Sequence, residues 1–186
     1  MLRLVGVADA IKNALEKAAF ASGWLLVVLM FITCTDIVAR KFGIPIPLTK
    51  FQEMEYYLHT VVFSGWMGYN YAINTHPRVD SYTETLPFHV RAWLELIGCL
   101  IFALPFMTLI VWHGWDFFWS SFWQNESSEH VAGLPYRWIV KGIFYVGTIL
   151  VLFGIISVML RLVAFLFGGV NQKDSGLDLG HVELEA

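Results

Sequence analysis

Residues 48–80 read LTKFQEMEYYLHTVVFSGWMGYNYAINTHPRVD, and the rest of the chain can be understood as what surrounds this stretch. Its apolar and aromatic run continues without proline for more than twenty residues and predicts a helix that ends in the polar turn at Asn74. At about 1.5 Å per residue, such a helix can cross a hydrocarbon core of about 30 Å. Thr49 and Gln52 match the T-x-x-Q pattern, so we expect a capping box at its start.

The composition indicates an integral membrane protein. Of the 186 residues, 57% are hydrophobic and 15% are charged, whereas soluble domains have about 45–50% and about 25%. The apolar residues gather in four blocks, roughly residues 21–41, 48–73, 89–123 and 136–167. We therefore expect an all-α membrane protein with four tilted transmembrane helices. The net charge of −3 gives no basis for nucleic-acid binding.

The sequences that flank the four blocks are different in kind. In residues 1–20, apolar side chains recur at helical spacing among charged ones, which predicts an N-terminal amphipathic helix in the membrane interface. A frayed polar lead-in is the alternative. Residues 21–168 then form the four-helix membrane domain. Residues 169–186 are polar and acidic, so we expect a mobile tail.

The third and fourth blocks are longer than an upright span needs. The third covers about 50 Å as a helix, so it must tilt or project beyond the membrane. Pro105 lies near its middle and should bend it. Tryptophans recur every three or four residues near its end, which is typical of an interfacial aromatic belt. They are Trp112, Trp115, Trp119 and Trp123.

The distribution of Lys and Arg sets the expected orientation. Four spans place both termini on one side of the membrane. Seven of the twelve Lys and Arg residues then lie on that side and five on the other. Because cytoplasmic segments carry the excess of positive charge, we expect both termini in the cytoplasm.

Two features of the first and second blocks predict helix contacts. Asp36 and Arg40 are four residues apart and share a helix face, so they can form an ion pair. Ser64, Gly68 and Ala72 form a stripe of small residues, which lets another helix approach closely. We expect this stripe to be a helix-packing surface, which the partner subunit covers if the stripe faces it.

Catalytic and metal-binding motifs are absent from the sequence, including H-E-x-x-H, C-x-x-C, G-x-S-x-G and a phosphate-binding glycine loop. Cys34 and Cys99 lie inside apolar blocks and resemble small buried hydrophobes. The alternative function is a haem-b membrane anchor of a respiratory enzyme, with His59 and His113 as the haem ligands. Against this, Glu55 stands one helical turn before His59 and can be its partner. We therefore expect no enzyme activity, no cofactor and no metal.

Four short motifs occur in order along the chain. They are Lys50-Phe51-Gln52-Glu53-Met54-Glu55, His76-Pro77-Arg78-Val79-Asp80, Leu104-Pro105-Phe106, and Gly133-Leu134-Pro135 followed by Trp138 and Lys141. In this order and spacing they resemble the small permease subunit of TRAP (tripartite ATP-independent periplasmic) transporters, the DctQ-like family. That family usually has K-x-Q-E-L-E, H-V-R-V-D, L-P-F and G-L-P-x-x-W-x-x-K. The resemblance covers roughly residues 18–168 and is closest to the branch labelled mannitol/chloroaromatic. Pro77 departs from it by replacing the usual valine.

The resemblance implies a four-helix subunit of the bacterial inner membrane with both termini in the cytoplasm. It implies a large permease partner, which carries the substrate and sodium sites and moves like an elevator, and a periplasmic substrate-binding protein that docks on the outer face. The transported solute would by class be an organic acid or a related small molecule. The small subunit would be a non-catalytic scaffold in a heterodimer with the large permease.

Charged residues near the span ends are the candidate partner-interface and structural residues. They are Asp36, Arg40, Glu53, Glu55, Arg78, Asp80, Arg137 and Lys141. Within this set we expect Arg40 to pair with Glu53 or Glu55, because an ionised group inside a span needs a partner. The alternative is that each charge reaches water by snorkelling. The candidate contacts for the binding protein are Lys50, Glu126 and Glu129.

Overall fold

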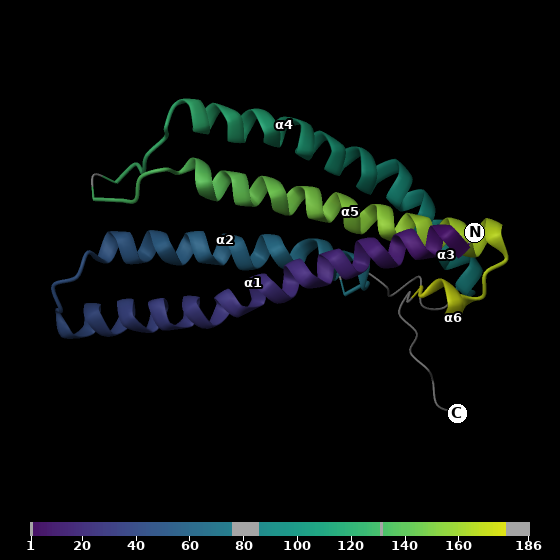
Figure 1. Cartoon of the computed structure of the whole chain (residues 1–186), viewed down its shortest axis with the longest axis horizontal. Helices are drawn as coiled ribbons and strands as arrows, with labels where there is room; N and C mark the ends of the chain where they lie inside the picture. Colours follow the sequence, from purple (N-terminus) through teal and green to yellow (C-terminus); the bar gives the residue numbers. More distant parts are fainter. Residues whose placement is uncertain (1, 76–85, 131, 178–186) are drawn as a thin grey trace.

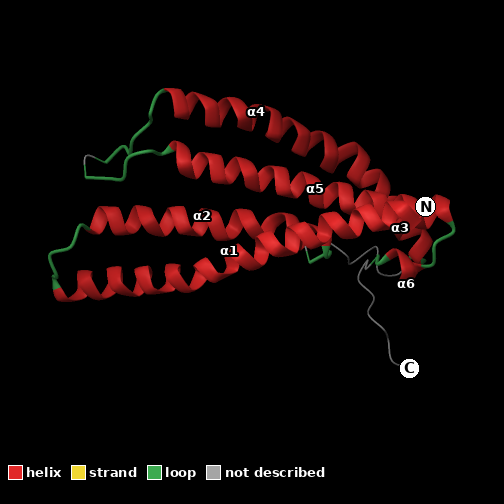
Figure 2. Cartoon of the chain, in the orientation of Figure 1, coloured by secondary structure: helices red, strands yellow, loops and turns green. Residues whose placement is uncertain are grey.

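The computed structural model describes residues 2–75, 86–130 and 132–177, and within these ranges the chain is helical, with no strand (Figure 2). The all-α fold class is therefore confirmed. The elements are α1 (Leu2–Phe42), α2 (Leu48–Ala72), α3 (Phe88–Gly98), the π-helix η1 (Cys99–Ala103), α4 (Leu104–Trp123), α5 (Trp138–Gly168) and α6 (Gln172–Ser175).

Four long helices form a flat, elongated bundle (Figure 1). They lie side by side in the order α4, α5, α2, α1, and the first part of α1 crosses α2 to reach α5. The N-terminus, α3, α6 and the end of α5 gather at one end, which we call the termini end. The linkers 43–47 and 124–137 lie at the opposite end, which we call the loop end.

Small residues on one face of α2 bring it close to α5. A Cβ atom added at Gly68 would collide with the backbone carbonyl of Leu150, and one added at Gly147 would lie 2.5 Å from Ser64 Cβ. Ser64 and Gly68 therefore do pack against another helix backbone, as small residues do in membranes. At Ser64 and Gly68 the stripe therefore faces α5 of the same chain and not a partner subunit.

A second face of α2 contacts α1. A Cβ atom at Gly65 would collide with the side chain of Ser22, so the two backbones are close at this level. One turn of α1 away, the Trp66 indole Nε1 donates a hydrogen bond to the Ala19 carbonyl at 2.8 Å. With close contacts on two sides, α2 is the central helix of the bundle.

The start of α2 differs from the expected capping box. Pro47 is the N-cap, and no side chain makes a capping hydrogen bond. Gln52 Nε2 donates instead to the Tyr56 hydroxyl at 3.2 Å. The predicted capping box is wrong because the helix already begins at Leu48, so Thr49 lies inside the first turn rather than before it.

Residues 2–42 form one helix, and it is not divided at residue 20. Its first half packs into the bundle: Ala8 and Leu15 are buried, and Ser157 Oγ on α5 donates to the Ala8 carbonyl at 3.0 Å. The structure therefore shows no separate helix over residues 1–20. The reason is that charged side chains interrupt a hydrophobic pattern but not backbone hydrogen bonding. Placement of this half in the membrane interface stays a prediction.

In the described part of the chain, three helices are long and apolar enough to cross a membrane: Arg3–Phe42, Phe88–Trp123 and Trp138–Gly168. Although α2 has 25 residues, it is not among them, so the four predicted spans are not confirmed. Its first three turns contain Lys50, Glu53, Glu55 and His59, which lower its hydropathy.

The continuous run from Phe88 to Trp123 contains a π-helical turn just before Pro105. The Leu104 N–H donates to the Cys99 carbonyl, five residues back, which is the π pattern. A proline ring clashes with the carbonyl four residues before it, and the wider turn relieves this clash. Figure 1 shows that the run changes direction between α3 and α4, which agrees with the bend expected at this proline.

The C-terminal segment folds back onto the termini end. Gly169, with φ of +62°, ends α5 in the left-handed conformation that glycine adopts readily. Ser175 and Leu177 are buried, and Leu177 packs with Leu162 of α5 and Ala92 of α3. Residues 175 and 177 are therefore packed on the bundle. The mobility expected of residues 169–186 stays a prediction, and residues 178–186 lie outside the described part of the chain.

Candidate functional site

The linker 124–137 is closed on itself by backbone hydrogen bonds at the loop end. The Arg137 N–H donates to the Glu126 carbonyl at 2.8 Å, and the Ser128 N–H donates to the Leu134 carbonyl at 3.2 Å. Asn125 and Tyr136 take positive φ values of 47° and 64° and reverse the chain direction at the two ends of the linker. Left-handed backbone is uncommon for residues other than glycine. The two backbone hydrogen bonds and these two reversals together define one compact conformation.

Glu53 ties this linker to α2. Its side chain is only 9% exposed, and it accepts hydrogen bonds from the Ser128 hydroxyl and from the Leu134 backbone N–H. A Cβ atom at Gly133 would lie 2.5 Å from Glu53 Oε1, so the linker approaches the carboxylate closely at this glycine. Hydrogen bonds to an ionised carboxylate are stronger than neutral ones. Glu53 is therefore the main anchor between α2 and the linker.

Lys141 in the first turn of α5 and Arg137, the N-cap residue just before α5, neutralise the acids of the linker. Lys141 Nζ forms an ion pair with Glu126 and lies 4.2 Å from the centroid of the Phe117 ring. Arg137 Nη1 lies 2.9 Å from Glu129 Oε1 and 3.8 Å from Glu126 Oε1. We call Glu53, Glu126, Glu129, Arg137 and Lys141 the loop-end cluster. It joins α2, the linker and α5 through charge.

Three members of the cluster, Glu53, Glu129 and Arg137, line a cavity of about 290 Å³ between α2, the linker and α5. Its walls include Glu53, Tyr57, His130 and Arg137, so it offers hydrogen-bond donors and acceptors together. The described residues contain no group of three or more His, Cys, Asp or Glu side chains that could hold a metal ion. The arrangement suits recognition of polar groups on a partner.

The pKa of Glu126 is lowered by its hydrogen bond with Lys141 and by the nearby charge of Arg137. A lowered pKa in the folded state means that the carboxylate stabilises the fold above its unfolded pKa of about 4.3. This contribution is lost as the pH falls through the lower, folded value. We expect the melting temperature of the purified protein to fall once the pH is lowered below about 4.3. This fall should be about 2–4 °C smaller in Glu126→Gln than in the wild type.

The matched control for this prediction is Glu129→Gln. The Glu129 side chain is 84% exposed, and exposed ion pairs contribute little. Its pH profile should follow the wild type. Identical profiles for the Glu126 and Glu129 variants would show that the Lys141 ion pair does not stabilise the linker.

Of the two pairings expected for Arg40, the structure contains one. Its Nε and Nη2 atoms lie 2.6 Å and 3.1 Å from the two carboxylate oxygens of Asp36, so the predicted i, i+4 pair on α1 is present. The expected pairing of Arg40 with Glu53 or Glu55 is not formed. Glu53 faces the linker, and Glu55 Oε1 is buried with no hydrogen-bond partner among the described residues.

Among the remaining candidates, Lys50 is exposed in the first turn of α2, beside the linker 43–47. Glu126 and Glu129 lie in the linker 124–137, as predicted. Arg78 and Asp80 lie outside the described residues. The sequence did not predict that the Ser128 hydroxyl and the Leu134 backbone N–H donate to Glu53. Leu134 lies in the recognisable motif Gly133-Leu134-Pro135, but the motif does not identify the partner of its N–H.

The aromatic residues of α4 form a stacked series. The Trp115 and Trp119 rings stack at 5.2 Å between centroids, and Trp119 stacks on Phe122 at 5.5 Å. Phe118 stacks on Tyr145 of α5 at 6.4 Å. Trp112 and Trp123 are exposed. Because the series also joins α4 to α5, helix packing is enough to explain these aromatic residues. The interfacial belt therefore stays a prediction.

A family model for "Tripartite ATP-independent periplasmic transporters, DctQ component" matches residues 29–165. The match covers well over half of the chain, including α2, α4 and nearly all of α5. The chain belongs to the DctQ family. No curated protein and no solved structure matches it.

Membership identifies this DctQ chain as the small subunit of a TRAP transporter, which works with a large permease and a periplasmic binding protein. A DctQ component is part of a transporter and not an enzyme. The haem-anchor alternative is not supported, because His59 on α2 and His113 on α4 lie on helices separated by α5 (Figure 1).

Proposed function

We propose that this DctQ chain is a non-catalytic scaffold of a sodium-coupled TRAP transporter in the bacterial inner membrane. It forms a heterodimer with the large permease and presents its loop end to the periplasmic binding protein. The observation that carries the proposal is the anchoring of linker 124–137 to α2 through Glu53. A linker held on two helices is a fixed surface, whereas a free loop would have to order on each encounter.

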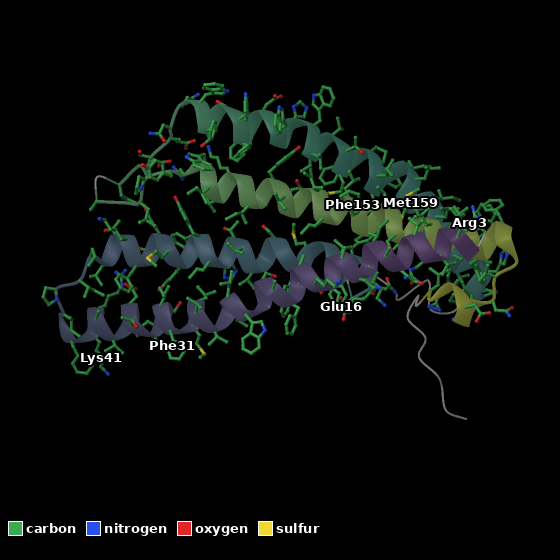
Figure 3. The ribbon with its side chains drawn as sticks, viewed as in Figure 1. Arg3, Glu16, Phe31, Lys41, Phe153 and Met159 are labelled. Carbon is green, nitrogen blue, oxygen red and sulfur yellow. The ribbon has the colours of Figure 1, made fainter. Side chains whose placement is uncertain are left out.

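The exposed helix faces support the scaffold role. Large apolar side chains such as Trp24 and Phe31 on α1 and Phe106 on α4 are more than half exposed. Figure 3 shows Phe31 pointing away from the bundle. The described part of the chain has three helices apolar enough to cross a membrane, so these faces suit contact with lipid or with a larger membrane protein.

Lys50, Glu126 and Glu129 are the proposed contacts for the binding protein. Charged residues at a rim steer association and can exchange partners quickly. Glu129 is the most open of the cluster acids and pairs only with Arg137 among the described residues. A transient contact of this kind matches a binding protein that must dock and leave in each transport cycle.

The transported solute is proposed to be an organic acid or a related small molecule, and the mannitol/chloroaromatic branch is the proposed subgroup. The organic acid rests on the class of transporter, and the subgroup rests on the sequence motifs. The substrate and sodium sites are proposed to lie in the large permease.

In the proposed orientation, both termini lie in the cytoplasm and the loop end faces the periplasm. Ser127 is exposed in the linker and Asp174 is exposed in α6. In a background without Cys34 and Cys99, Ser127→Cys should react with an impermeant thiol reagent added to intact cells. Asp174→Cys should react only after the membrane is opened. The reverse pattern would contradict the orientation.

Reconstitution into liposomes tests the function. The large permease, this chain and the binding protein together should accumulate substrate in response to a sodium gradient. The permease alone should fail, and this chain alone should bind no substrate in calorimetry. Uptake without this chain, or substrate binding by it alone, would show that it is not a scaffold.

A further inference from the structure

A polar cavity lies at the termini end, at the opposite end of the bundle from the loop-end cluster (Figure 1). Its volume is about 210 Å³, and its walls come from α1, the end of α2, α5 and the residues that follow α6. Here the first part of α1 crosses α2 and contacts α5, so three helices meet around the space. One water occupies about 30 Å³ in the liquid, and the cavity therefore has room for a polyatomic ligand.

Positive charge dominates the walls of this cavity. Lys12 on α1 and Arg161 on α5 line it, and among the described lining residues there is no Asp or Glu. Asp9 pairs with Arg161, but the Asp9 side chain is 54% exposed and does not line the cavity. One acid against two cations leaves a net charge of +1 for these three groups. The cavity therefore favours an anion.

Arg161 is only 4% exposed and is held in a fixed position. Its Nη1 donates to the Ser175 carbonyl at 2.8 Å, and its Nη2 donates to Asp9 Oδ1 at 2.5 Å. A Cβ atom at Gly176 would collide with Arg161 Nη1, so the segment after α6 closes directly against the guanidinium. A side chain that is already fixed loses little conformational entropy when a ligand binds.

Most hydrogen-bond donors of the two cations are unused. A guanidinium has five N–H donors, and three of those of Arg161 make no hydrogen bond within the described part of the chain. Lys12 makes neither a hydrogen bond nor an ion pair with any described residue. A buried donor without an acceptor is costly. The arrangement therefore suits a ligand that brings several acceptor oxygens.

The cavity lies at the level where the apolar segments end. Lys12 precedes the first apolar block, residues 21–41, and Asn74 in the cavity wall follows the second, residues 48–73. In a bilayer, the polar headgroups lie just outside the hydrocarbon core. Basic pockets between membrane helices bind phosphate headgroups at this level, and an Arg side chain suits phosphate because it donates two parallel hydrogen bonds.

We propose that this cavity is a binding site for a phosphate group, to which Lys12 and Arg161 donate hydrogen bonds. The phosphate belongs either to an anionic phospholipid or to free inorganic phosphate, and the two differ in whether acyl chains add to the affinity. The site is independent of the proposed scaffold function, because it uses neither the loop end nor a partner subunit. A bound phosphate would join the first part of α1 to α5.

The test titrates the full chain in detergent with three probes. They are dioctanoyl phosphatidylglycerol, dioctanoylglycerol, which has the same acyl chains without phosphate, and inorganic phosphate. Phosphatidylglycerol should raise the melting temperature, because a ligand that binds only the folded state stabilises it, and dioctanoylglycerol should not. Lys12→Gln should raise the Kd for phosphatidylglycerol at least about tenfold. Lys17→Gln is the matched control and should bind like the wild type, since Lys17 is exposed on the same helix and does not line the cavity.

The two phosphate probes distinguish the sources. Binding of phosphatidylglycerol at least about tenfold tighter than inorganic phosphate would identify the lipid, and equal affinities would identify the free ion. Either result supports the site. Equal binding by Lys12→Gln and the wild type, equal stabilisation by dioctanoylglycerol and phosphatidylglycerol, or no binding of either phosphate probe would overturn it and leave the scaffold function standing.

Protection of a cysteine in the cavity wall gives a readout that keeps both cations. Ile73 lines the cavity and is partly buried. In a background without Cys34 and Cys99, phosphatidylglycerol at ten times its Kd should slow the reaction of Ile73→Cys with a thiol reagent about tenfold, because about one site in ten stays open. Ser127→Cys at the loop end should react at an unchanged rate. An Ile73→Cys rate that neither phosphate probe lowers would overturn the site.

Discussion

Gly68→Leu is expected to lower the free energy of unfolding by more than about 3 kcal/mol, the upper end of the usual cost of adding atoms to a packed core. The added side chain would meet the backbone of Leu150, which cannot rotate away as a side chain can. Gly154 repeats the contact one turn further, since a Cβ atom there would lie 2.5 Å from the Gly68 carbonyl oxygen. Melting of the purified protein in detergent measures the effect.

Gly6→Leu is the control for this substitution. No atom lies within 4 Å of a Cβ atom at Gly6, which is also inside a helix. A leucine there should leave the melting temperature unchanged or raise it, because glycine is about 0.5–1 kcal/mol worse than alanine in a helix. Equal melting of the Gly68 and Gly6 variants would contradict the packing of α2 on α5.

Arg161→Met is expected to have the second largest effect. Arg161 is buried in α5, where its Nη1 donates to the Ser175 carbonyl at 2.8 Å and its Nη2 lies 2.5 Å from Asp9 Oδ1. It therefore joins α1, α5 and α6. Loss of one member of a buried pair costs about 3–5 kcal/mol. Because the Asp9 side chain is 54% exposed and can return to water, we expect about 2–3 kcal/mol.

The same substitution should release the C-terminal segment. The buried Ser175 carbonyl loses its donor, so residues 172–177 should become accessible to protease while α5 stays protected. Asp9→Asn is the comparison: it keeps the Ser175 bond but leaves the buried guanidinium without its carboxylate. This variant should lower the melting temperature without exposing the segment. Protection of residues 172–177 in the Arg161 variant would show that Leu177 alone holds them.

The elements that the sequence predicted well are those that depend on near neighbours. The end of α5 at Gly169 follows from a glycine that tolerates positive φ. The Asp36–Arg40 pair follows from their spacing on one helix. The bend before α4 follows from Pro105. In each case the cause lies within about five residues, so it can be read along the chain.

Other predictions failed because local patterns do not identify their partners. Ser64 and Gly68 predict a close helix contact but not which helix makes it. Only the fold shows that this helix is α5. Glu53 is an acid that needs donors, but its donors come from a linker 75 and 81 residues away. Residues 172–175 of the tail are polar, and only the fold shows that Arg161 gives Ser175 a buried partner.

The sequence by itself determined that this protein is a helical membrane subunit of the DctQ family, because hydropathy, helix length and motif order are properties of consecutive residues. The tertiary structure alone decided that α2 lies between α1 and α5, that Glu53 holds the linker, and that Lys12 and Arg161 line one cavity. These outcomes depend on which surfaces meet across the chain. That choice is set by the combined fit of many distant side chains, which no single stretch encodes.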